Sequence, residues 1–292
     1  MRTLIDFRAA RVFAVPTSDG LRVGALVEGP QGWGEFSPPP DADDALAARW
    51  LTAAMEPSTV GWPDAVRGQV PVAAARIAVS PSSSGTDIEH VQAVADRLTN
   101  GEVLRCVVPV DDVEAAVRVI RDLSRMAPAV DIVELSCDSA DSAEAVRSRV
   151  DMPVAVDSEV LARAARPAQA ADAVILSSGP LGGVRRALRR AELTGLPALV
   201  NLVALTSIGV AGDVALAASV PDLRYPCGPV PSWLAEVDLV SAPRSLSGAG
   251  AFLPAAPTPA SPDAARLARC EVTDPATLER WRALLQRAGE AR

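Results

Sequence analysis

Two hydroxyl groups stand at the end of an expected strand in the stretch "ADAVILSSGPLGGVRRAL", residues 171–188. They belong to Ser177 and Ser178, which follow an apolar run and precede an Arg-rich helical segment. In α/β barrels the catalytic groups come from this end of each strand. A serine nucleophile needs a base within hydrogen-bond reach, and the sequence offers His90 or Asp157. Because His90 lies in the helix-like segment "DIEHVQAVADRL", we expect it on the surface.

The charged residues restrict proton-transfer chemistry further. All 28 basic residues are arginine, and the chain contains no lysine. An arginine side chain cannot act as a general base, because its pKa lies above ~12. With a single histidine and no lysine, the chain lacks most of the groups that exchange protons near neutral pH.

Glycines and arginines beside the two serines form two more patterns. "GPLGGV", residues 179–184, is a Gly-rich turn that opens a helix, and helix N-termini attract anions. The turn therefore predicts either an anion site or a purely structural connection. Four arginines on the following helix predict a solvated outer face, paired in part with Glu192; they are Arg185, Arg186, Arg189 and Arg190.

Composition excludes several classes of function. The formal net charge of -8 disfavours a nucleic-acid binder, since phosphate contacts need a basic face. No apolar run approaches the ~18 residues of a membrane span, and the first residues lack the apolar stretch of a secretory signal. We therefore expect a cytoplasmic protein that binds neither nucleic acid nor membrane. Free thiols rather than disulfides or zinc are expected, because no C-x-x-C pair occurs among Cys106, Cys137, Cys227 and Cys270.

The order of the expected elements predicts two domains. Residues 1–71 contain two short strands joined by the hairpin turn "TSDG", a Gly/Pro-rich loop and a helix, with Trp33 and Phe36 expected to be buried. Residues 72–244 alternate short apolar runs with helical segments, a pattern typical of a parallel barrel. Residues 245–292 hold a loop and one helix that we expect to complete the first domain. The predicted fold class is α/β, with an α+β capping domain and a βα barrel.

Motifs along nearly the whole chain resemble one family. "GWGEFSPPPDADDALAARWL", "GWPDAVRGQVPV", "DMPVAVDSEV", "ADAVILSSGPLGGVRRALRRAELTGLP" and "TSIGVAGDVALAASVPDL" follow, in order, the segments of actinobacterial o-succinylbenzoate synthases. This family belongs to the muconate-lactonizing subgroup of the enolase superfamily. The resemblance implies a capped barrel that dehydrates a cyclohexadiene carboxylate in menaquinone biosynthesis, with Mg²⁺ stabilising an enediolate.

The resemblance also implies where the catalytic lysines would stand. The family's Lys-x-Lys pair, whose second lysine acts as base and then acid, aligns with Arg105 and Val107 in "VLRCVVPV". The lysine on the opposite strand aligns with Ser177. None of the three catalytic lysines is therefore present. We interpret the small serines as filling the space that a lysine would occupy.

Two of the three metal carboxylates have counterparts in this chain. The second aligns with Glu134 in "VELS" and the third with Asp157 in "VAVDSEV", with Glu159 and Asp138 nearby. The first ligand's Asp-Ala-Asn motif is missing, together with about one helix–strand unit, so a barrel of seven strands is expected. The carboxylates either hold Mg²⁺ or are remnants that now bind water, backbone or an arginine.

Two hypotheses about function follow. The first is an o-succinylbenzoate synthase-like protein without that activity, whose barrel mouth binds a small carboxylate or whose surface binds an unknown partner protein. The second is an active o-succinylbenzoate synthase, or another Mg-dependent lyase or isomerase, that uses a base other than lysine. The absence of lysine favours the first.

Overall fold

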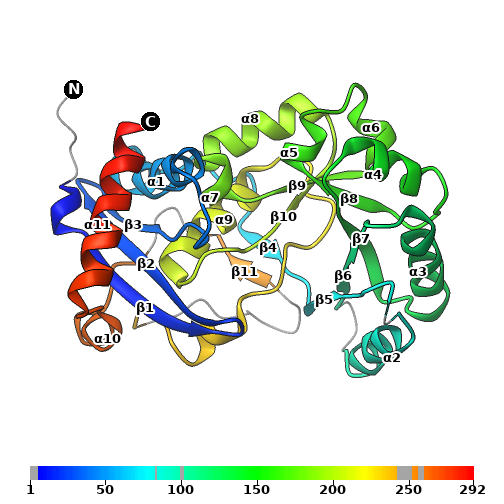
Figure 1. Ribbon diagram of the computed structural model, residues 1–292, viewed down its shortest axis with the longest axis horizontal. Helices are drawn as coiled ribbons and strands as arrows, with labels where there is room; N and C mark the ends of the chain where they lie inside the picture. The colour runs from blue at the N-terminus through cyan, green and yellow to red at the C-terminus, as the bar shows by residue number, and fades with distance from the viewer. Residues whose placement is uncertain (1–5, 83, 99–101, 242–251, 256–259) are drawn as a thin grey trace.

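Two bodies of different topology make up the chain in the computed structural model, which describes residues 6–82, 84–98, 102–241, 252–255 and 260–292. The first is an antiparallel sheet with two helices packed on one face, at the left of Figure 1. The second is a curled parallel sheet surrounded by helices, at the right of Figure 1. None of the described helices has the length and hydropathy that a bilayer span needs.

The first body, the cap, is built on three antiparallel strands in the order β1-β2-β3. The predicted turn "TSDG" joins the first two strands, and Thr17 pairs with Gly20 at its base. Gly20 has a φ of 111°, a left-handed conformation that glycine adopts without steric cost. The strands are β1 (Arg11–Thr17), β2 (Gly20–Gly29) and β3 (Gly32–Phe36).

Two helices cover one face of the cap sheet. Helix α1 (Asp44–Thr59) begins after Asp43, whose carboxylate caps the first turn. Helix α11 (Pro275–Glu290) packs against α1, although the two are far apart in the sequence. The ring of Trp281 meets that of Phe36 edge-on, with centroids 5.8 Å apart, so the C-terminal helix shares the core of the cap.

The predicted domain boundaries, 1–71 with 245–292 and 72–244, stay a prediction. Residues 245–251 and 256–259 of that division lie outside the described part of the chain. The elements outside the cap sheet, its two helices and the parallel barrel are β4 (Gln69–Pro71), β11 (Phe252–Pro254), α10 (Ala264–Cys270) and the 3₁₀ turns Phe7–Ala9 and Ser232–Ala235.

The second body, the barrel, contains six parallel strands, and sequential strands are neighbours throughout. Short apolar runs form most of them because β6 to β10 are covered on both faces, whereas the edge strand β5 is partly exposed. In sheet order they are β10 (Ala198–Val200), β9 (Ala173–Leu176), β8 (Val154–Asp157), β7 (Val130–Ser136), β6 (Leu104–Pro109) and β5 (Ala75–Ala78). The helices between and after them are α2 (Ser84–Ala95), α3 (Val113–Met126), α4 (Ala140–Arg147), α5 (Ser158–Leu161), α6 (Pro167–Ala170), α7 (Ser178–Leu181), α8 (Val184–Thr194) and α9 (Ser207–Ser219).

An irregular segment, residues 222–228, lies between β10 at one edge of the parallel sheet and the residues that lead from β4 into β5. On one side the N–H of Gly228 donates to the carbonyl of Val200 at 2.8 Å. On the other side the N–H of Cys227 donates to the carbonyl of Pro71 at 2.8 Å. The described parallel sheet therefore has six strands instead of the seven that the sequence predicts, and the segment adds only isolated bridges. The missing unit leaves no gap, because β6 pairs directly with β7.

The two faces of the curled sheet have different contents. On β7, Val133 and Leu135 belong to the main core shared with the helices, whereas Ile132 and Glu134 alternate with them and face the lumen. The lower lumen is filled by a separate apolar cluster: Ile132, Ala155, Ala173, Ile175, Leu199 and Tyr225. The polar residues of the lumen lie toward the carboxyl ends of the strands, where barrel enzymes keep their chemistry.

Candidate functional site

A buried arginine crosses the lumen at the level of Glu134. Arg105 extends from β6 and its Nη2 lies 2.6 Å from Oε1 of Glu134 on β7. The same nitrogen lies 2.6 Å from Oδ1 of Asn201, just after β10 at the far end of the sheet. Longer contacts join Nη1 to the carbonyls of Val200 (3.4 Å) and Pro226 (3.5 Å). One side chain therefore links four positions of the barrel wall.

A second arginine holds the same carboxylate. Arg76 on β5 is the strand partner of Arg105, and its guanidinium grips Glu134 with two nitrogens. Its Nε lies 2.9 Å from Oε1 and its Nη2 lies 2.9 Å from Oε2. The amide of Asn201 adds a fourth donor, 3.2 Å from Oε2. This group of four residues, Arg76, Arg105, Glu134 and Asn201, is called the lumen network below.

The electrostatics of the lumen network keep Glu134 ionised. Burial alone would raise the pKa of this carboxyl, since its residue is only 1% exposed. The charges and hydrogen bonds of Arg105 and Arg76 outweigh burial and hold the pKa below its ordinary value. Arg105 is fully buried, whereas the side chain of Arg76 is 41% exposed.

The other two lysine positions hold no group that exchanges protons near neutral pH. Val107 is half-buried on β6, where it pairs in register with Glu134 of β7. Ser177 is buried at the end of β9, and its hydroxyl donates to the carbonyl of Asn201 at 3.3 Å. The three aligned positions are thus an ion-paired arginine, an apolar side chain and a hydroxyl bonded to backbone.

The donor set does not fit Mg²⁺, which wants an octahedral shell of free oxygen ligands. Both oxygens of Glu134 accept hydrogen bonds from cationic or amide donors. Asp157 caps the short helix α5 by accepting from the N–H of Glu159 at 2.7 Å. Among the described residues, no group of three or more His, Cys, Asp or Glu could hold a metal ion.

Ser178 has a carboxylate partner, but it is Asp213 rather than the predicted Asp157. Its hydroxyl and its backbone N–H both donate to Oδ1 of Asp213, at 2.8 and 2.7 Å. The other oxygen of Asp213 accepts from the N–H of Val203 at 3.0 Å. Burial raises the pKa of Asp213 to about 6. These bonds anchor the start of α7 to α9. His90 is exposed on α2, as predicted.

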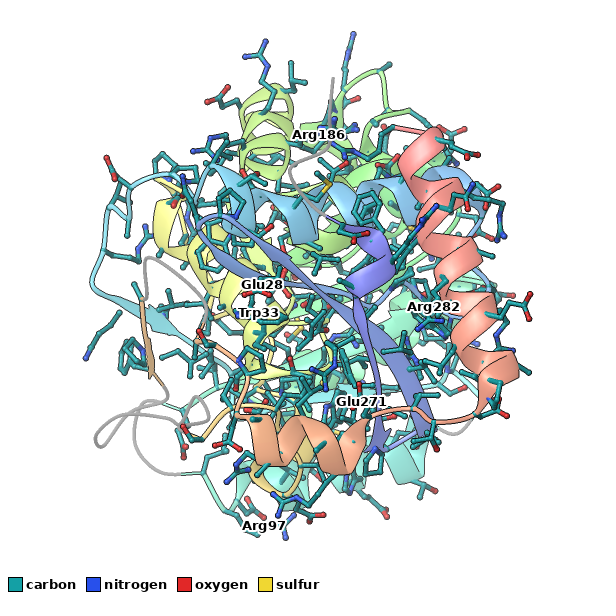
Figure 2. The ribbon with its side chains drawn as sticks, turned by 90° about the vertical axis from the view of Figure 1, so that its left-hand side faces the viewer. Glu28, Trp33, Arg97, Arg186, Glu271 and Arg282 are labelled. Atoms are coloured by element: carbon teal, nitrogen blue, oxygen red, sulfur yellow. The ribbon has the colours of Figure 1, made fainter. Side chains whose placement is uncertain are left out.

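The predicted anion site at "GPLGGV" is filled by the protein itself. Oε2 of Glu56, on helix α1 of the cap, lies 2.5 Å from the N–H of Val184 at the start of α8. Its other oxygen accepts from Arg185, at 3.2 Å from the backbone N–H and 2.8 Å from Nη1. The sequence pattern predicted that Arg185 is part of a solvated face. This prediction is wrong for Arg185, because its side chain binds Glu56 of the cap. Arg186 projects from the same helix at the top of Figure 2.

The "GWGEFSP" segment places another carboxylate between cap and barrel. Glu35 is buried, and it accepts from Ser37 at 2.5 Å and from the N–H groups of Leu205 (2.7 Å) and Thr206 (3.0 Å). Phe36 is fully buried as predicted, whereas Trp33 is only half-buried beside its strand partner Glu28 (Figure 2).

Several of these residues were not predicted from the sequence. Arg76 and Asn201 each interrupt an apolar run, "AAARIAV" and "PALVNLV", close to the end of a strand. A lone polar residue in such a run is a usable signal for a lumen position. Asp213 is the only charged residue of the apolar helix α9 and carries the same signal, whereas nothing in the local pattern distinguishes Glu56 from a surface carboxylate.

Comparison with known proteins defines the class of fold. A family model described as "Enolase N-terminal domain-like" matches residues 20–58, in the cap. The structure of muconate cycloisomerase from Pseudomonas fluorescens superposes with a TM-score of 0.71 at 17% identity, covering 90% of this chain and 97% of that chain. An enolase from Thermobispora bispora, complexed with magnesium and formate, gives 0.66 at 18% identity, covering 89% and 90%. The chain has the enolase-superfamily fold.

Sequence similarity narrows the class to a family. The o-succinylbenzoate synthase of Thermobifida fusca is 39% identical, and the alignment covers 96% of this chain and 96% of that protein. The o-succinylbenzoate synthase of Mycolicibacterium smegmatis is 33% identical over 82% of this chain and 83% of that protein. The chain belongs to the o-succinylbenzoate synthase family, as the motifs predicted.

Proposed function

We propose that the chain is a member of this family that does not carry out its dehydration, and that it acts by binding instead of by turnover. One observation carries the proposal: the three lysine positions hold Arg105, Val107 and Ser177. A positioned general base contributes about 10²–10⁴ to a rate. Groups that act as a unit are not replaced one at a time, so losing several leaves little of the original rate.

No other side chain in the lumen network takes over the proton transfer. Arg105 keeps its proton at any working pH, because guanidinium has a pKa above ~12 in proteins. Glu134 is a weak base, since its pKa is lowered and both of its oxygens already accept hydrogen bonds. Asn201 and Ser177 are amide and hydroxyl groups that take up no proton near neutral pH, and they donate to Glu134 and to a backbone carbonyl.

The charge of the lumen network supports a binding role for a small carboxylate. Two guanidinium groups face the single carboxylate of Glu134, which leaves one positive charge without a counter-charge inside the network. The side chain of Arg76 is 41% exposed, so part of this charge reaches solvent at the barrel. A guanidinium binds carboxylates through paired hydrogen bonds, and this chemistry favours an organic acid. We include in the same proposal that the protein is cytoplasmic and that its role is linked to menaquinone biosynthesis.

A turnover assay tests the loss of activity. Purified protein is incubated with Mg²⁺ and the family's cyclohexadiene carboxylate, beside the Thermobifida fusca relative as the active control. We expect product from the relative and none above background from this chain. Conversion by this chain at a rate comparable with the relative would overturn the proposal.

Calorimetric titration tests the binding role with succinate and benzoate as probes. We expect millimolar binding that Arg76→Met abolishes, because this substitution removes the exposed guanidinium. Arg282→Met is the matched control, since Arg282 is an exposed arginine on α11 of the cap (Figure 2). Equal affinity in both variants, or no heat with the wild-type chain, would contradict a carboxylate site at Arg76.

A further inference from the structure

We infer that the guanidinium of Arg105 is a built-in cation that stands in place of a metal ion as the counter-charge of Glu134. The barrel of this chain is then stable without metal. The inference starts from the misfit between the lumen network and Mg²⁺. It is independent of whether the chain retains turnover, because it concerns what neutralises one buried carboxylate.

The hydrogen bonds of Glu134 leave no room for a metal ion. An ionised carboxylate has about four acceptor positions. Four donors use them: Nη2 of Arg105 at 2.6 Å, Nε and Nη2 of Arg76 at 2.9 Å each, and the amide of Asn201 at 3.2 Å. A divalent cation would have to displace a guanidinium and then sit beside two positive charges. The binding of a metal ion is therefore opposed by the occupied acceptor positions of Glu134 and by repulsion from the guanidinium groups.

Burial explains why a counter-charge is needed at all. The side chains of Arg105 and Glu134 are 0% and 2% exposed, and an unpaired charge at such depth is strongly unfavourable. A bound metal leaves when its concentration falls, whereas Arg105 is covalently part of β6. Neutralisation by Arg105 is therefore permanent and needs no metal in the surroundings.

Arg105 also joins several segments of the barrel wall, as a metal ion bound by residues of several strands would. Its contacts reach β7 through Glu134, β10 through the carbonyl of Val200, and the irregular segment 222–228 through the carbonyl of Pro226. Among the described side chains that are fully buried, Arg105 is the largest. A long side chain suits a lumen that lacks one helix–strand unit, since it fills space and carries charge together.

Metal titration of the wild-type chain is the first test. Purified protein is freed of metal with a chelator and titrated with Mn²⁺, whose free fraction is followed by electron paramagnetic resonance. Thermal unfolding is recorded with and without millimolar Mg²⁺. We expect no Mn²⁺ binding that depends on Glu134 and no change in Tm. Stoichiometric Mn²⁺ binding that Glu134→Gln removes would overturn the inference.

Substitution of the arginine is the second test. Arg105→Met should lower Tm by on the order of 10 °C, because it leaves a buried carboxylate with only Arg76. Adding Glu134→Gln to Arg105→Met should restore part of that loss, because the buried group is then neutral and no longer depends on the partly exposed Arg76 as its single counter-charge. Arg147→Met is the matched control, because Arg147 pairs with Asp172 at 2.6 Å in a part-exposed position and should cost only a few degrees.

The outcomes separate this inference from the proposed function. An Arg105→Met chain that melts like wild type, or a double variant that melts no higher than the single one, would refute the counter-charge role. If Arg105→Met does not fold, Arg105→Lys takes its place, with an intermediate loss expected because lysine keeps the charge without the planar fork. Turnover without Mg²⁺ would refute the proposed function and leave this inference intact.

Discussion

The barrel lumen and the junction between cap and barrel both bury carboxylates, and they neutralise them in opposite ways. In the lumen, Glu134 is surrounded by formal positive charge, which lowers its pKa. At the junction, Glu35 accepts from backbone N–H and hydroxyl groups, among them the hydroxyl of Thr206, and burial raises its pKa. The comparison teaches that buried charge in this fold is held either by ions or by dipoles, and that the two regions respond differently to acid.

The two solutions also serve different parts of the architecture. The lumen network joins strands of one body. The junction carboxylates join two bodies, because Glu35 on β3 binds the N-terminal region of α9 and Glu56 on α1 binds that of α8. Helix N-termini offer free N–H groups and a partial positive charge, which suits a carboxylate without a cation. The cap carboxylates are thus docked mainly on backbone N–H groups, with Arg185 as an added cation at Glu56, while the lumen network is held by ions.

The largest expected effect is in the lumen. Glu134→Gln should reduce the free energy of unfolding by about 3–5 kcal/mol, because the fully buried Arg105 loses its counter-charge. Urea unfolding measures the loss. Asp172→Asn is the control, since its ion pair with Arg147 is partly exposed and should be worth about 1 kcal/mol. Equal losses in the two variants would end the distinction between ionic lumen and ordinary surface pairs.

A smaller loss is expected at the junction. Glu35→Gln should cost about 2 kcal/mol, because one of the two oxygens becomes an NH₂ group that cannot accept, which leaves the N–H of either Leu205 (on Oε1) or Thr206 (on Oε2) without its acceptor. Hydrogen exchange locates the change. We expect faster exchange in β3 and at the start of α9, and unchanged exchange in β6 and β7. Loosening that spreads equally into the barrel strands would show that the two regions are not independent.

Mild acid should stabilise the contact between α7 and α9 of the barrel through Asp213. Its pKa is raised from 3.8 to about 6, so the folded chain binds more protons than the unfolded chain between these values. The stability it contributes is fully present below about pH 4 and is lost as pH rises through 6. Between pH 7 and pH 5 the gain should be about 1 kcal/mol.

Asp213→Asn provides the matched measurement. It should lower stability at every pH and flatten the rise between pH 7 and pH 5, as recorded by urea midpoints. Glu134 contributes with the opposite sign, because its lowered pKa makes its stabilisation fall away only in stronger acid, below its ordinary value of 4.5. A rise of unchanged size in the variant would assign the pH dependence to another group.

Much of the fold, and the positions of the aligned site residues, could be predicted from sequence. The hairpin turn ending in Gly20 and the alternation of apolar runs with helices are local patterns, and local patterns survive folding. The partners of Glu134 could not be predicted. They come from β5, β6 and the end of β10, which are brought together only when the sheet curls and closes. The sequence allows Mg²⁺, water, backbone or an arginine as the partner of Glu134, and only the tertiary structure selects the arginine.

The same limit explains the arginine pattern on α8 and leads to the smallest expected effect. Arg185 and Arg189 lie one turn apart, so the sequence assigns them one role. Arg185 instead donates to Glu56 at 2.8 Å and to the carbonyl of Gly61 at 2.6 Å, whereas Arg189 pairs with the exposed Glu192.

Arg185→Ala should therefore lower the free energy of unfolding by about 1 kcal/mol, and Arg189→Ala by about 0.3 kcal/mol or less. Thermal and urea unfolding of both variants in parallel measure the difference. In high salt the Arg189 effect should vanish, because exposed pairs are screened, while most of the Arg185 effect persists through its carbonyl bond. Indistinguishable variants would mean that the dipole-held carboxylate of Glu56 needs no cation, which would make the contrast between junction and lumen sharper still.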